Sequence, residues 1–397
     1  MKKITAFLRL FLRTLIHPSY LATLLNHYTG RLYQVNDDNY HLDAAISWIN
    51  HSIDRNDGKG SSGIYTFHHG WLEPYPETSG YIIPTLISYS RLTNHVEYVE
   101  RAIKLSDWEI DLQLSSGAIR GGVGINAYPI VFNTGQVMIG WLAMYNHSKD
   151  AKYLEAAERS AQWLVQIMDE DGKWAKNTYN NLPHAYNIRV TWPLLETGLI
   201  TKNELFVKAA EKNIKWVLAN SKDNGWVDHM GFTTNETPFT HTIAYTIRGL
   251  IECGVLLEDN KIKKQTLDLA FKAADSVRKS YEFHQHKRKI RGMLPGQLDH
   301  SWSSDSNYSC LTGNAQFAII WLKLYQLTGN VSFLNSSIQI MEQLKSTQNL
   351  KTFNKGIRGG VPGSYPTWGD YIHFGYPNWA AKFFADALIL KREILTQ

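Results

Sequence analysis

A short motif recurs along the 397-residue chain and limits what the chain can fold into. Residues 119–123 read Ile-Arg-Gly-Gly-Val, residues 357–361 repeat the same five, and residues 290–292 repeat the first three. Each copy follows a stretch with helical periodicity and leads through an irregular loop into an apolar segment. Helical units repeated at such spacing usually close into rings or solenoids whose loops gather on one rim. The motif therefore predicts successive copies of one helical unit.

Two classes of helical segment alternate along the chain. The first class is amphipathic and charged, and its members span residues 41–55, 98–113, 151–168, 204–220, 262–281 and 331–348. The second class is almost uncharged, and its members start near Glu77, Asn133, Tyr186, Thr240, Leu311 and Tyr376. A helix that is apolar on all sides is enclosed by other helices. We therefore predict an all-α fold, an (α/α)6 toroid of six hairpins with a buried inner ring.

The chain divides into two expected parts. Residues 36–397 form a single (α/α)6 domain, because no linker or charge run interrupts the repeat. Residues 1–35 form an amphipathic N-terminal segment in which Arg9 and Arg13 interrupt an apolar run. That run is too short and too charged to span a bilayer. We expect residues 1–20 either to lie on the inner membrane as a basic amphipathic helix or to pack on the domain.

Charge and motifs exclude several classes of function. The net charge of +5 is spread without a basic block, so nucleic-acid binding is not expected. There is no zinc or calcium motif, no Gly-x-Ser-x-Gly elbow and no phosphate-binding glycine loop, so we expect neither metal nor cofactor. Cys253 and Cys310 lie too far apart in sequence to indicate a disulfide framework, and a cytoplasmic location is expected.

Clusters of small polar residues open the uncharged segments. Ser, Thr and Asn are common helix caps, but a cap needs one residue and these clusters contain several. In a toroid all six inner helices would start at the same rim, where their N–H groups and dipoles favour anions. With aromatic residues at 12% of the chain, either a sugar-binding cleft or a thick helical core is possible. The rim is the predicted functional face.

Four residues at this rim are candidates for catalysis, namely Glu77, Tyr186, His241 and Asp370. Glu77 could instead be a capping carboxylate favoured by the helix dipole. His241 could be a hydrogen-bonded structural residue. Asp370 lies among aromatic residues in the loop before the last inner helix, a pattern typical of sugar contact.

A larger set is expected to bind substrate through polar or aromatic contacts. It comprises Arg120, Asn133, Gln136, His184, Asn187, Arg189, Tyr245, Asn314, Gln316, Tyr365, Trp368, Tyr371 and Trp379. Arg120, Arg291 and Arg358 belong to the repeated loops, which favours a role in holding loops in place. Of these, Arg120 and Arg358 could also reach an anionic sugar.

Three functions fit these residues. The favoured one is proton abstraction at C5 of a uronic acid, by a C5-epimerase or lyase that uses Tyr or His. The second is a glycoside hydrolase, which needs two carboxylates roughly 5–10 Å apart, such as Glu77 and Asp370. The third is a non-catalytic glycan-binding or assembly protein. In each case the expected partner is an oligosaccharide or polysaccharide, and an anionic one is favoured.

Four segments carry a resemblance to a known family. They are residues 132–136, 153–159, 309–316 and 378–386. Over roughly residues 40–395 the chain resembles the VpsJ-like proteins of bacterial exopolysaccharide and capsule gene clusters, in the six-hairpin glycosidase-like superfamily. The resemblance implies an (α/α)6 toroid and a role in polysaccharide synthesis or tailoring on the cytoplasmic side. Related toroids include glycosidases, uronate lyases, uronyl C5-epimerases and sugar 2-epimerases, and fold alone does not choose among them.

Overall fold

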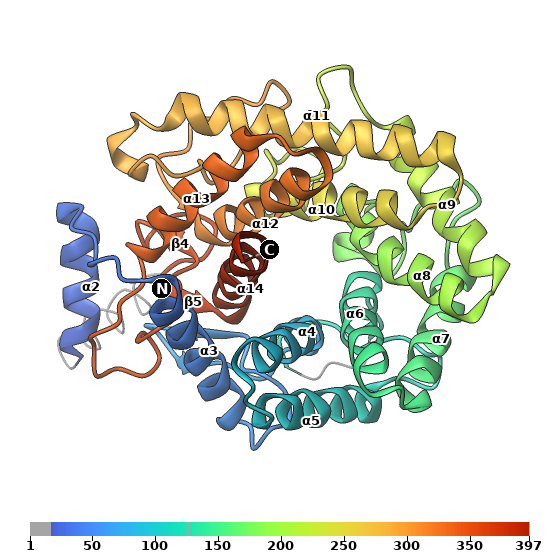
Figure 1. Cartoon of the computed structure of the whole chain (residues 1–397), viewed down its shortest axis with the longest axis horizontal. Coiled ribbons are helices and arrows are strands. Elements are labelled where there is room, and N and C mark those ends of the chain that lie inside the picture. The colour runs from blue at the N-terminus through green and yellow to red at the C-terminus, as the bar shows by residue number, and fades with distance from the viewer. Residues whose placement is uncertain (1–16, 125–127, 397) are drawn as a thin grey trace, which may run out of the picture.

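Twelve helices form two concentric rings in the computed structural model, which describes residues 17–124 and 128–396 (Figure 1). The inner ring consists of α4 (Pro76–Thr93), α6 (Val131–Ser148), α8 (Ile188–Thr201), α10 (Thr240–Leu256), α12 (Leu311–Thr328) and α14 (Asn378–Leu395). The outer ring consists of α3 (Asp38–Asp54), α5 (Glu97–Leu112), α7 (Ala151–Gln166), α9 (Glu204–Ala219), α11 (Asn260–His284) and α13 (Val331–Lys345). The predicted (α/α)6 toroid is confirmed, and each inner helix starts within two residues of its expected position.

Glycines let the inner helices pack closely enough to close the ring. Each inner helix contacts the next, and α14 returns to α4. A Cβ atom on Gly80 would lie 2.6 Å from Val137 Cα, and one on Gly135 would lie 2.8 Å from Val190 Cα. Such distances are well below van der Waals contact, so only glycine fits where these helices cross. The core is continuous around the ring.

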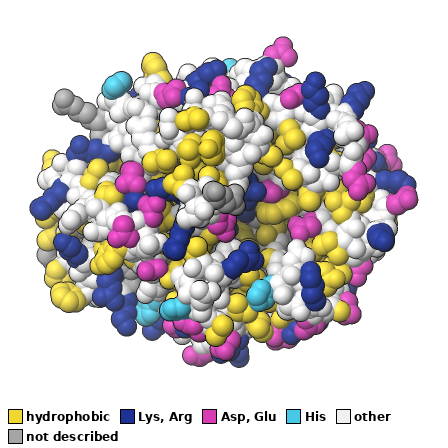
Figure 2. All heavy atoms as spheres, in the orientation of Figure 1, with side chains coloured by type: hydrophobic (Ala, Val, Ile, Leu, Met, Phe, Trp, Pro, Cys, Tyr) yellow, Lys and Arg dark blue, Asp and Glu magenta, His cyan; other side chains and the backbone are white. Residues whose placement is uncertain are grey.

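The outer helices begin with side-chain caps that the sequence provides locally. In five of them an Asp or Asn accepts a hydrogen bond from a backbone N–H of the first turn, and these caps are Asp37, Asp150, Asn203, Asp259 and Asn330. A cap of this kind stabilises a helix by about 1 kcal/mol. Their solvent-exposed faces carry charges of both signs. Figure 2 shows acidic and basic side chains mixed over the face of the molecule where α14 ends.

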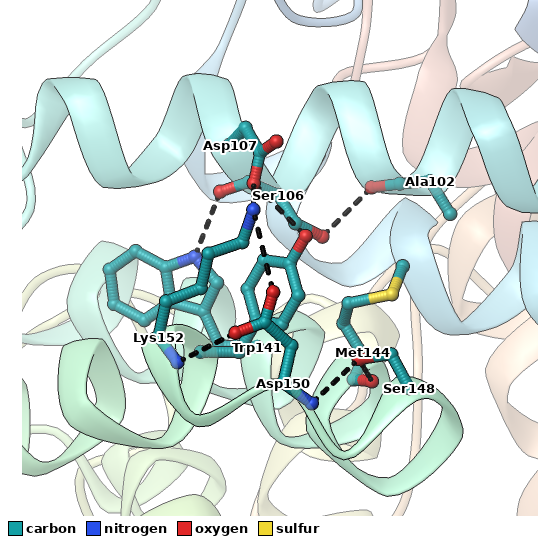
Figure 3. A network of polar contacts seen from close by, with 9 residues as sticks. Ala102, Ser106, Asp107, Trp141, Met144, Ser148, Asp150 and Lys152 are labelled. Carbon is teal, nitrogen blue, oxygen red and sulfur yellow. Dashed lines mark hydrogen bonds and ion pairs between the residues drawn. The ribbon is translucent and has the colours of Figure 1, made fainter.

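Polar contacts join each inner helix to its outer neighbours. Trp141 on α6 donates from Nε1 to the carbonyl of Ser106 on α5, at 3.1 Å. Lys152 at the start of α7 lies 2.7 Å from Asp107 on α5, so the two outer helices are also tied to each other. Figure 3 shows this network between the three helices. The same kind of contact occurs in another hairpin, where Trp321 of α12 donates from Nε1 to the carbonyl of Ala274 on α11.

Short strands and 3₁₀ helices lie in the loops at the rim where the inner helices start. Strand β1 (Ile64–Thr66) pairs antiparallel with β2 (Gly70–Trp71) and β5 (Gly375–Pro377), and β3 (Ser309–Cys310) pairs with β4 (Ser364–Tyr365). Short 3₁₀ helices span Tyr179–Asn181, Ala185–Asn187 and Arg288–Ile290. The β1–β5 pairing ties the first hairpin to the last, which places the long loop before α14 beside the start of α4.

Helix α2 (Pro18–Thr29) packs outside the ring against that same long loop. Its Tyr20 hydroxyl lies 2.7 Å from the Tyr65 hydroxyl, and His27 Nδ1 accepts from the backbone N–H of Thr367 at 2.9 Å. Most of the segment expected to lie on a membrane, residues 1–20, falls outside the described residues. Among the described residues, no helix is both long and apolar enough to cross a bilayer.

The repeated motif marks the ends of outer helices, as its spacing predicts. Arg120 donates from Nε to the carbonyl of Leu112 at the end of α5, at 3.2 Å. Arg291 donates from its guanidinium to the carbonyl of Gly30, which follows α2. The backbone of Gly122 and of Gly359 has positive φ, 75° and 84°, which favours glycine at both turns. These contacts support the prediction that the loop arginines hold loops in place.

Candidate functional site

A cavity of about 350 Å³ opens at the rim where the inner helices begin. The residues that line it come from the starts of α4, α6, α10 and α14 and from the loops that precede the inner helices. They are Tyr75, Glu77, Gly122, Tyr128, Ile130, Phe132, Asn133, Tyr179, Tyr186, Phe232, Phe239, His241, Tyr245, Tyr371, Ile372 and Trp379. No Lys or Arg and no acid other than Glu77 is among these lining residues of the described chain. The cavity is therefore mostly aromatic with one carboxyl group.

The aromatic rings form a nearly continuous wall. On one side, His241 lies 4.3 Å from Tyr245 and 5.2 Å from Tyr371 between ring centroids. Phe132 joins Tyr245 to Tyr186, at centroid distances of 5.0 and 5.4 Å. Rings at these separations and tilted angles pack favourably. The wall presents both apolar ring faces and polar hydroxyl edges to whatever occupies the cavity.

Glu77 lies in the first turn of α4 and is buried against this wall. The Tyr75 hydroxyl donates a hydrogen bond to its Oε2. Burial raises the pKa of Glu77 from 4.5 to about 7, although the Tyr75 hydrogen bond and the charge of Arg189 both act to lower it. Desolvation thus exceeds the two stabilising contacts. At neutral pH the carboxyl group is divided between its acid and base forms.

His241 opens α10 on the other side of the same cavity. Gln316 Nε2 donates a hydrogen bond to His241 Nδ1 at 2.7 Å. The other ring nitrogen, His241 Nε2, takes no part in this contact. Burial, followed by the charge of Arg189, lowers the pKa of His241 to about 3. The imidazole is therefore neutral at physiological pH. Beside it, the Tyr371 hydroxyl accepts from Trp379 Nε1 at 2.8 Å.

The polar clusters at the starts of the inner helices are not ordinary caps. Within the described residues, only α12 among the six has a cap side chain that bonds to its first turn, Cys310 Sγ accepting from the N–H of Gly313 at 3.4 Å. The capping interpretation of these clusters was therefore wrong for the other five helices. Their first N–H groups converge on the rim, where helix dipoles make the potential positive.

Seven of the predicted site residues meet at this cavity. They are Glu77, Asn133, Tyr186, His241, Tyr245, Tyr371 and Trp379. Glu77 and Trp379 are about three hundred positions apart in the chain, and only ring closure between α4 and α14 brings them together.

Asp370 does not join them. Its side chain is 74% exposed, and its partner is His373, with Oδ1 3.8 Å from the imidazole Nε2. Although α4 and α14 are neighbours, as expected, the loop turns Asp370 outward while the next residue, Tyr371, faces the cavity. The predicted carboxylate pair of Glu77 and Asp370 is therefore not formed in this structure.

Several expected binding residues lie behind the wall and support it. His184 is held between the carbonyls of Gly231 and Tyr179 and stacks on Tyr186, with ring centroids 4.5 Å apart. Asn187 is buried close by. Gln136 accepts a 2.7 Å hydrogen bond from Arg189 Nε, and both side chains are buried below the cavity. These residues hold the site rather than line it.

The remaining expected residues lie outside the cavity and contact loops or neighbouring side chains. Asn314 donates to the carbonyl of Cys310 and accepts from the N–H of Leu294, so it joins two loop segments to α12. Gln316 lies behind His241 and donates a hydrogen bond to it without lining the cavity, and Tyr365 packs on the His27 ring with 4.8 Å between ring centroids. Trp368 is 39% exposed, and Arg120 is engaged with the end of α5. None of these five lines the cavity.

The sequence prediction missed part of the wall. The omitted aromatic residues are Tyr75, Tyr128, Phe132, Tyr179, Phe232 and Phe239. Tyr75, Phe132 and Phe239 lie within two residues of a predicted inner-helix start, so extending each polar cluster by two positions would have found them. Tyr128, Tyr179 and Phe232 come from irregular loops, where no periodic signal exists. Among the described residues no three His, Cys, Asp or Glu side chains converge as metal ligands.

A family model for the squalene–hopene cyclase C-terminal domain matches residues 71–251. No curated protein sequence matches the chain.

Solved structures cover almost the whole chain. An unsaturated glucuronyl hydrolase specific for heparin has a TM-score of 0.70 at 14% identity and covers 91% of this chain and 99% of its own. A polysaccharide lyase has a TM-score of 0.64 at 14% identity, covering 91% and 99%. The cellobiose 2-epimerase from Bacillus thermoamylovorans B4167 has a TM-score of 0.66 at 9% identity, covering 95% and 100%. Likeness at these identities establishes the fold, and the chain is an (α/α)6 toroid.

Proposed function

We propose that the protein is a carbohydrate-active enzyme that moves a proton on a sugar held in the aromatic cavity. The observation that carries this proposal is the one carboxyl group among the described residues that line the cavity, Glu77, which is buried and whose pKa of about 7 is matched to neutral pH. Proton transfer is most efficient when the pKa of the catalytic group lies near the working pH. Structures of similar fold include a hydrolase, a lyase and epimerases of saccharides, which agrees with a sugar substrate.

The other cavity residues suit supporting roles in such a reaction. Tyr75 orients the Glu77 carboxylate through its hydrogen bond. Burial raises the pKa of Tyr245 and of Tyr371, so both keep their protons at neutral pH. Together with neutral His241 they can donate hydrogen bonds to a sugar oxygen on which negative charge develops. The aromatic faces can stack on a sugar ring.

The lining favours a neutral saccharide. A carboxylate-bearing sugar would need a cation to offset its charge, and no Lys or Arg of the described residues lines the cavity. For a neutral aldose, the Glu77 carboxylate would remove the proton from the carbon beside the carbonyl, leaving an enediolate held by the donors. Return of the proton from Glu77 to C1, as the C2 hydroxyl proton passes to O1, gives the ketose, whereas protonation of the opposite face of C2 by a second proton donor gives the epimer. We therefore infer sugar epimerase or isomerase chemistry.

A uronate substrate is the second candidate, and the convergence of six helix N-termini at the rim favours it. Those dipoles could offset the carboxylate of a uronic acid in place of a cation, and Glu77 would then take the C5 proton in a C5-epimerase or lyase reaction. A hydrolase that uses a carboxylate pair is less well supported, because Asp370 points away from the cavity.

Solvent-exchange experiments separate these reactions. The protein is incubated in deuterated water with neutral aldoses and disaccharides in one arm and with uronate polymers in the other. Deuterium at C2 of a neutral sugar supports the first candidate, whereas deuterium at C5 or the ultraviolet absorbance of an unsaturated uronate supports the second. Glu77→Gln should abolish exchange in either arm, and Asp370→Asn, matched in chemistry, should leave it unchanged. Binding without exchange in both arms would instead indicate a non-catalytic glycan-binding protein.

The cellular setting follows from the resemblance to VpsJ-like proteins. We propose that the sugar belongs to an exopolysaccharide or capsule and that the protein acts on the cytoplasmic side. Residues 1–20 would contact the inner membrane through Lys2, Lys3, Arg9 and Arg13 together with adjacent apolar residues. Co-sedimentation with anionic vesicles, compared between the full chain and a variant that lacks residues 1–16, tests the membrane contact. Equal sedimentation of the two would contradict it.

A further inference from the structure

A second cavity, of about 290 Å³, lies at the opposite end of the barrel from the aromatic cavity. All six inner helices contribute to it. The lining residues that carry charge or could cover a sugar include Arg189, Trp192, Glu196, Arg248, Lys323 and Lys382. Figure 2 looks onto the face where α14 ends, with basic and acidic side chains interspersed around its centre. The chemistry of this cavity therefore differs sharply from that of the aromatic one.

Most of the cations around this second cavity already have acidic partners. Arg248 Nε and Lys323 Nζ lie 2.5 and 2.7 Å from Glu252 Oε1. Lys382 Nζ lies 2.5 Å from Asp386 Oδ2. Such pairs offset the cost of burying charge and also suit the C-terminal ends of helices, which favour cations. By themselves these three cations need no ligand.

Arg189 is the exception. Its side chain is buried, and its one hydrogen bond to a described residue runs from Nε to the neutral amide of Gln136. It forms no ion pair with any carboxylate of the described residues. Its two Nη atoms, the bidentate end of the guanidinium, are left without a described partner. An unpaired buried charge costs several kcal/mol, so a buried cation normally has an anion beside it.

The walls around Arg189 are suited to a sugar-sized molecule. The guanidinium lies 5.8 Å from the Trp192 ring and 5.5 Å from the Phe383 ring, both of which line the cavity, and 4.9 Å from the ring of Tyr245, which lines the aromatic cavity. Across the cavity, Glu196 has no cationic partner among the described residues; it accepts a long 3.4 Å contact from Asn146 Nδ2 and a hydrogen bond from the Trp192 indole. A carboxyl and an amide placed together can take up hydroxyl groups, and aromatic faces can cover a sugar ring.

We propose that this cavity is a second binding site, for a monosaccharide-sized metabolite that carries an oxyanion, with its carboxylate or phosphate held bidentately by Arg189. A guanidinium group binds a carboxylate or a phosphate in the same bidentate geometry. At the other end of the site, Glu196 and Asn146 would bind the hydroxyl groups of the sugar. The site has its own lining residues, while Arg189 also contacts Tyr245 and its charge acts on Glu77 of the aromatic cavity. The proposal goes beyond the proposed reaction and does not rest on it.

Calorimetric titration of the full chain at pH 7 and low salt tests the proposal. Glucuronate and glucose 6-phosphate serve as probes that distinguish the two oxyanions, with glucose as the neutral control. We expect at least one charged probe to bind and glucose not to bind measurably. Arg189→Gln should weaken the charged probe roughly ten- to a hundredfold, the cost of losing a charge-assisted hydrogen-bonding partner. Failure of both charged probes to bind would overturn the proposal.

Further variants keep the test decisive if Arg189→Gln fails to fold. Arg189→Lys keeps the charge but loses the fork, and it should weaken binding severalfold. Glu196→Gln should weaken the sugar probes while leaving inorganic phosphate unaffected. Tyr371→Phe, in the aromatic cavity, should bind the probes as the parent protein does. If Tyr371→Phe abolished binding while Arg189→Lys did not, the anion would occupy the other cavity and the second site would not exist.

Discussion

Tyr75 donates a hydrogen bond to Oε2 of Glu77, two residues ahead in the chain, and both side chains face the aromatic cavity. This contact opposes the desolvation that raises the pKa of Glu77 to about 7. Tyr75→Phe removes the donor but keeps the ring. The pKa of Glu77 should then rise further, because the charged form loses a partner while burial remains.

The change should appear in the pH profile of the reaction. If the Glu77 carboxylate acts as base, the activity of Tyr75→Phe at pH 6 should fall by roughly tenfold, with little loss on the alkaline plateau. The measurement is the rate from pH 5 to 9 for parent and variant. A midpoint that stays in place or moves to lower pH would show that Tyr75 does not act through Glu77.

Glu77→Gln should lower the rate by about 10²–10⁴-fold, the usual contribution of a group that transfers a proton. The fold should persist, because glutamine has almost the shape of the neutral acid. Steady-state kinetics together with a thermal melt separates loss of catalysis from loss of structure. A variant with normal turnover would remove Glu77 from the mechanism, and Asp370→Asn provides the exposed control.

Glu109 on α5 predicts an unusual dependence of stability on pH. It is fully buried, neither carboxyl oxygen has a hydrogen-bond partner among the described residues, and desolvation raises its pKa well above 4.5. Above pH 4.5 the unfolded chain therefore releases a proton that the folded chain keeps, so stability falls as pH rises toward the folded pKa.

Glu109→Gln removes this loss. At pH 7 we expect it to stabilise the protein and raise its Tm, because the neutral side chain has no proton to lose. At pH 4, Glu109 is largely protonated in both the folded and the unfolded parent protein. Parent and variant should therefore have similar Tm values at this pH. Melting curves at the two pH values measure the difference, and equal differences at both would contradict a buried neutral acid.

Gly135 predicts how tightly the inner ring is packed. Alanine is a better helix former than glycine by about 1 kcal/mol, yet its Cβ would lie 2.8 Å from Val190 Cα. We expect Gly135→Ala to destabilise the fold by about 1–3 kcal/mol, as overpacked cores do, and Gly135→Ser to cost more. Denaturant titration measures both. A raised midpoint for either variant would mean that α6 and α8 can move apart.

Local patterns in the chain were enough to predict the fold. The alternation of charged and uncharged helical segments specifies which helices are enclosed, and this pattern predicts six hairpins and the start of each inner helix to within two residues. Periodicity carries this information because burial of one helix depends mainly on its own residues. The same pattern places Glu77, Tyr186 and His241 at the rim, where all three line the cavity.

Side-chain direction at the rim could not be predicted in the same way. Glu77 faces the cavity, whereas Asp370 faces solvent and Arg189 reaches toward the opposite end of the barrel. In each case the direction depends on segments distant in sequence, because the path of the last loop is set by its pairing with β1 and the position of Arg189 by Gln136 on the neighbouring helix.

The sequence by itself thus specified the architecture and the rim on which polar and aromatic residues collect, since helical periodicity is a local property. The shape and charge of the two cavities arose only in the folded chain. The pKa of Glu77 is the clearest example, because it results from burial by residues drawn from α4, α6, α10 and α14 together with the charge of Arg189. Desolvation belongs to the assembled ring and to no single segment.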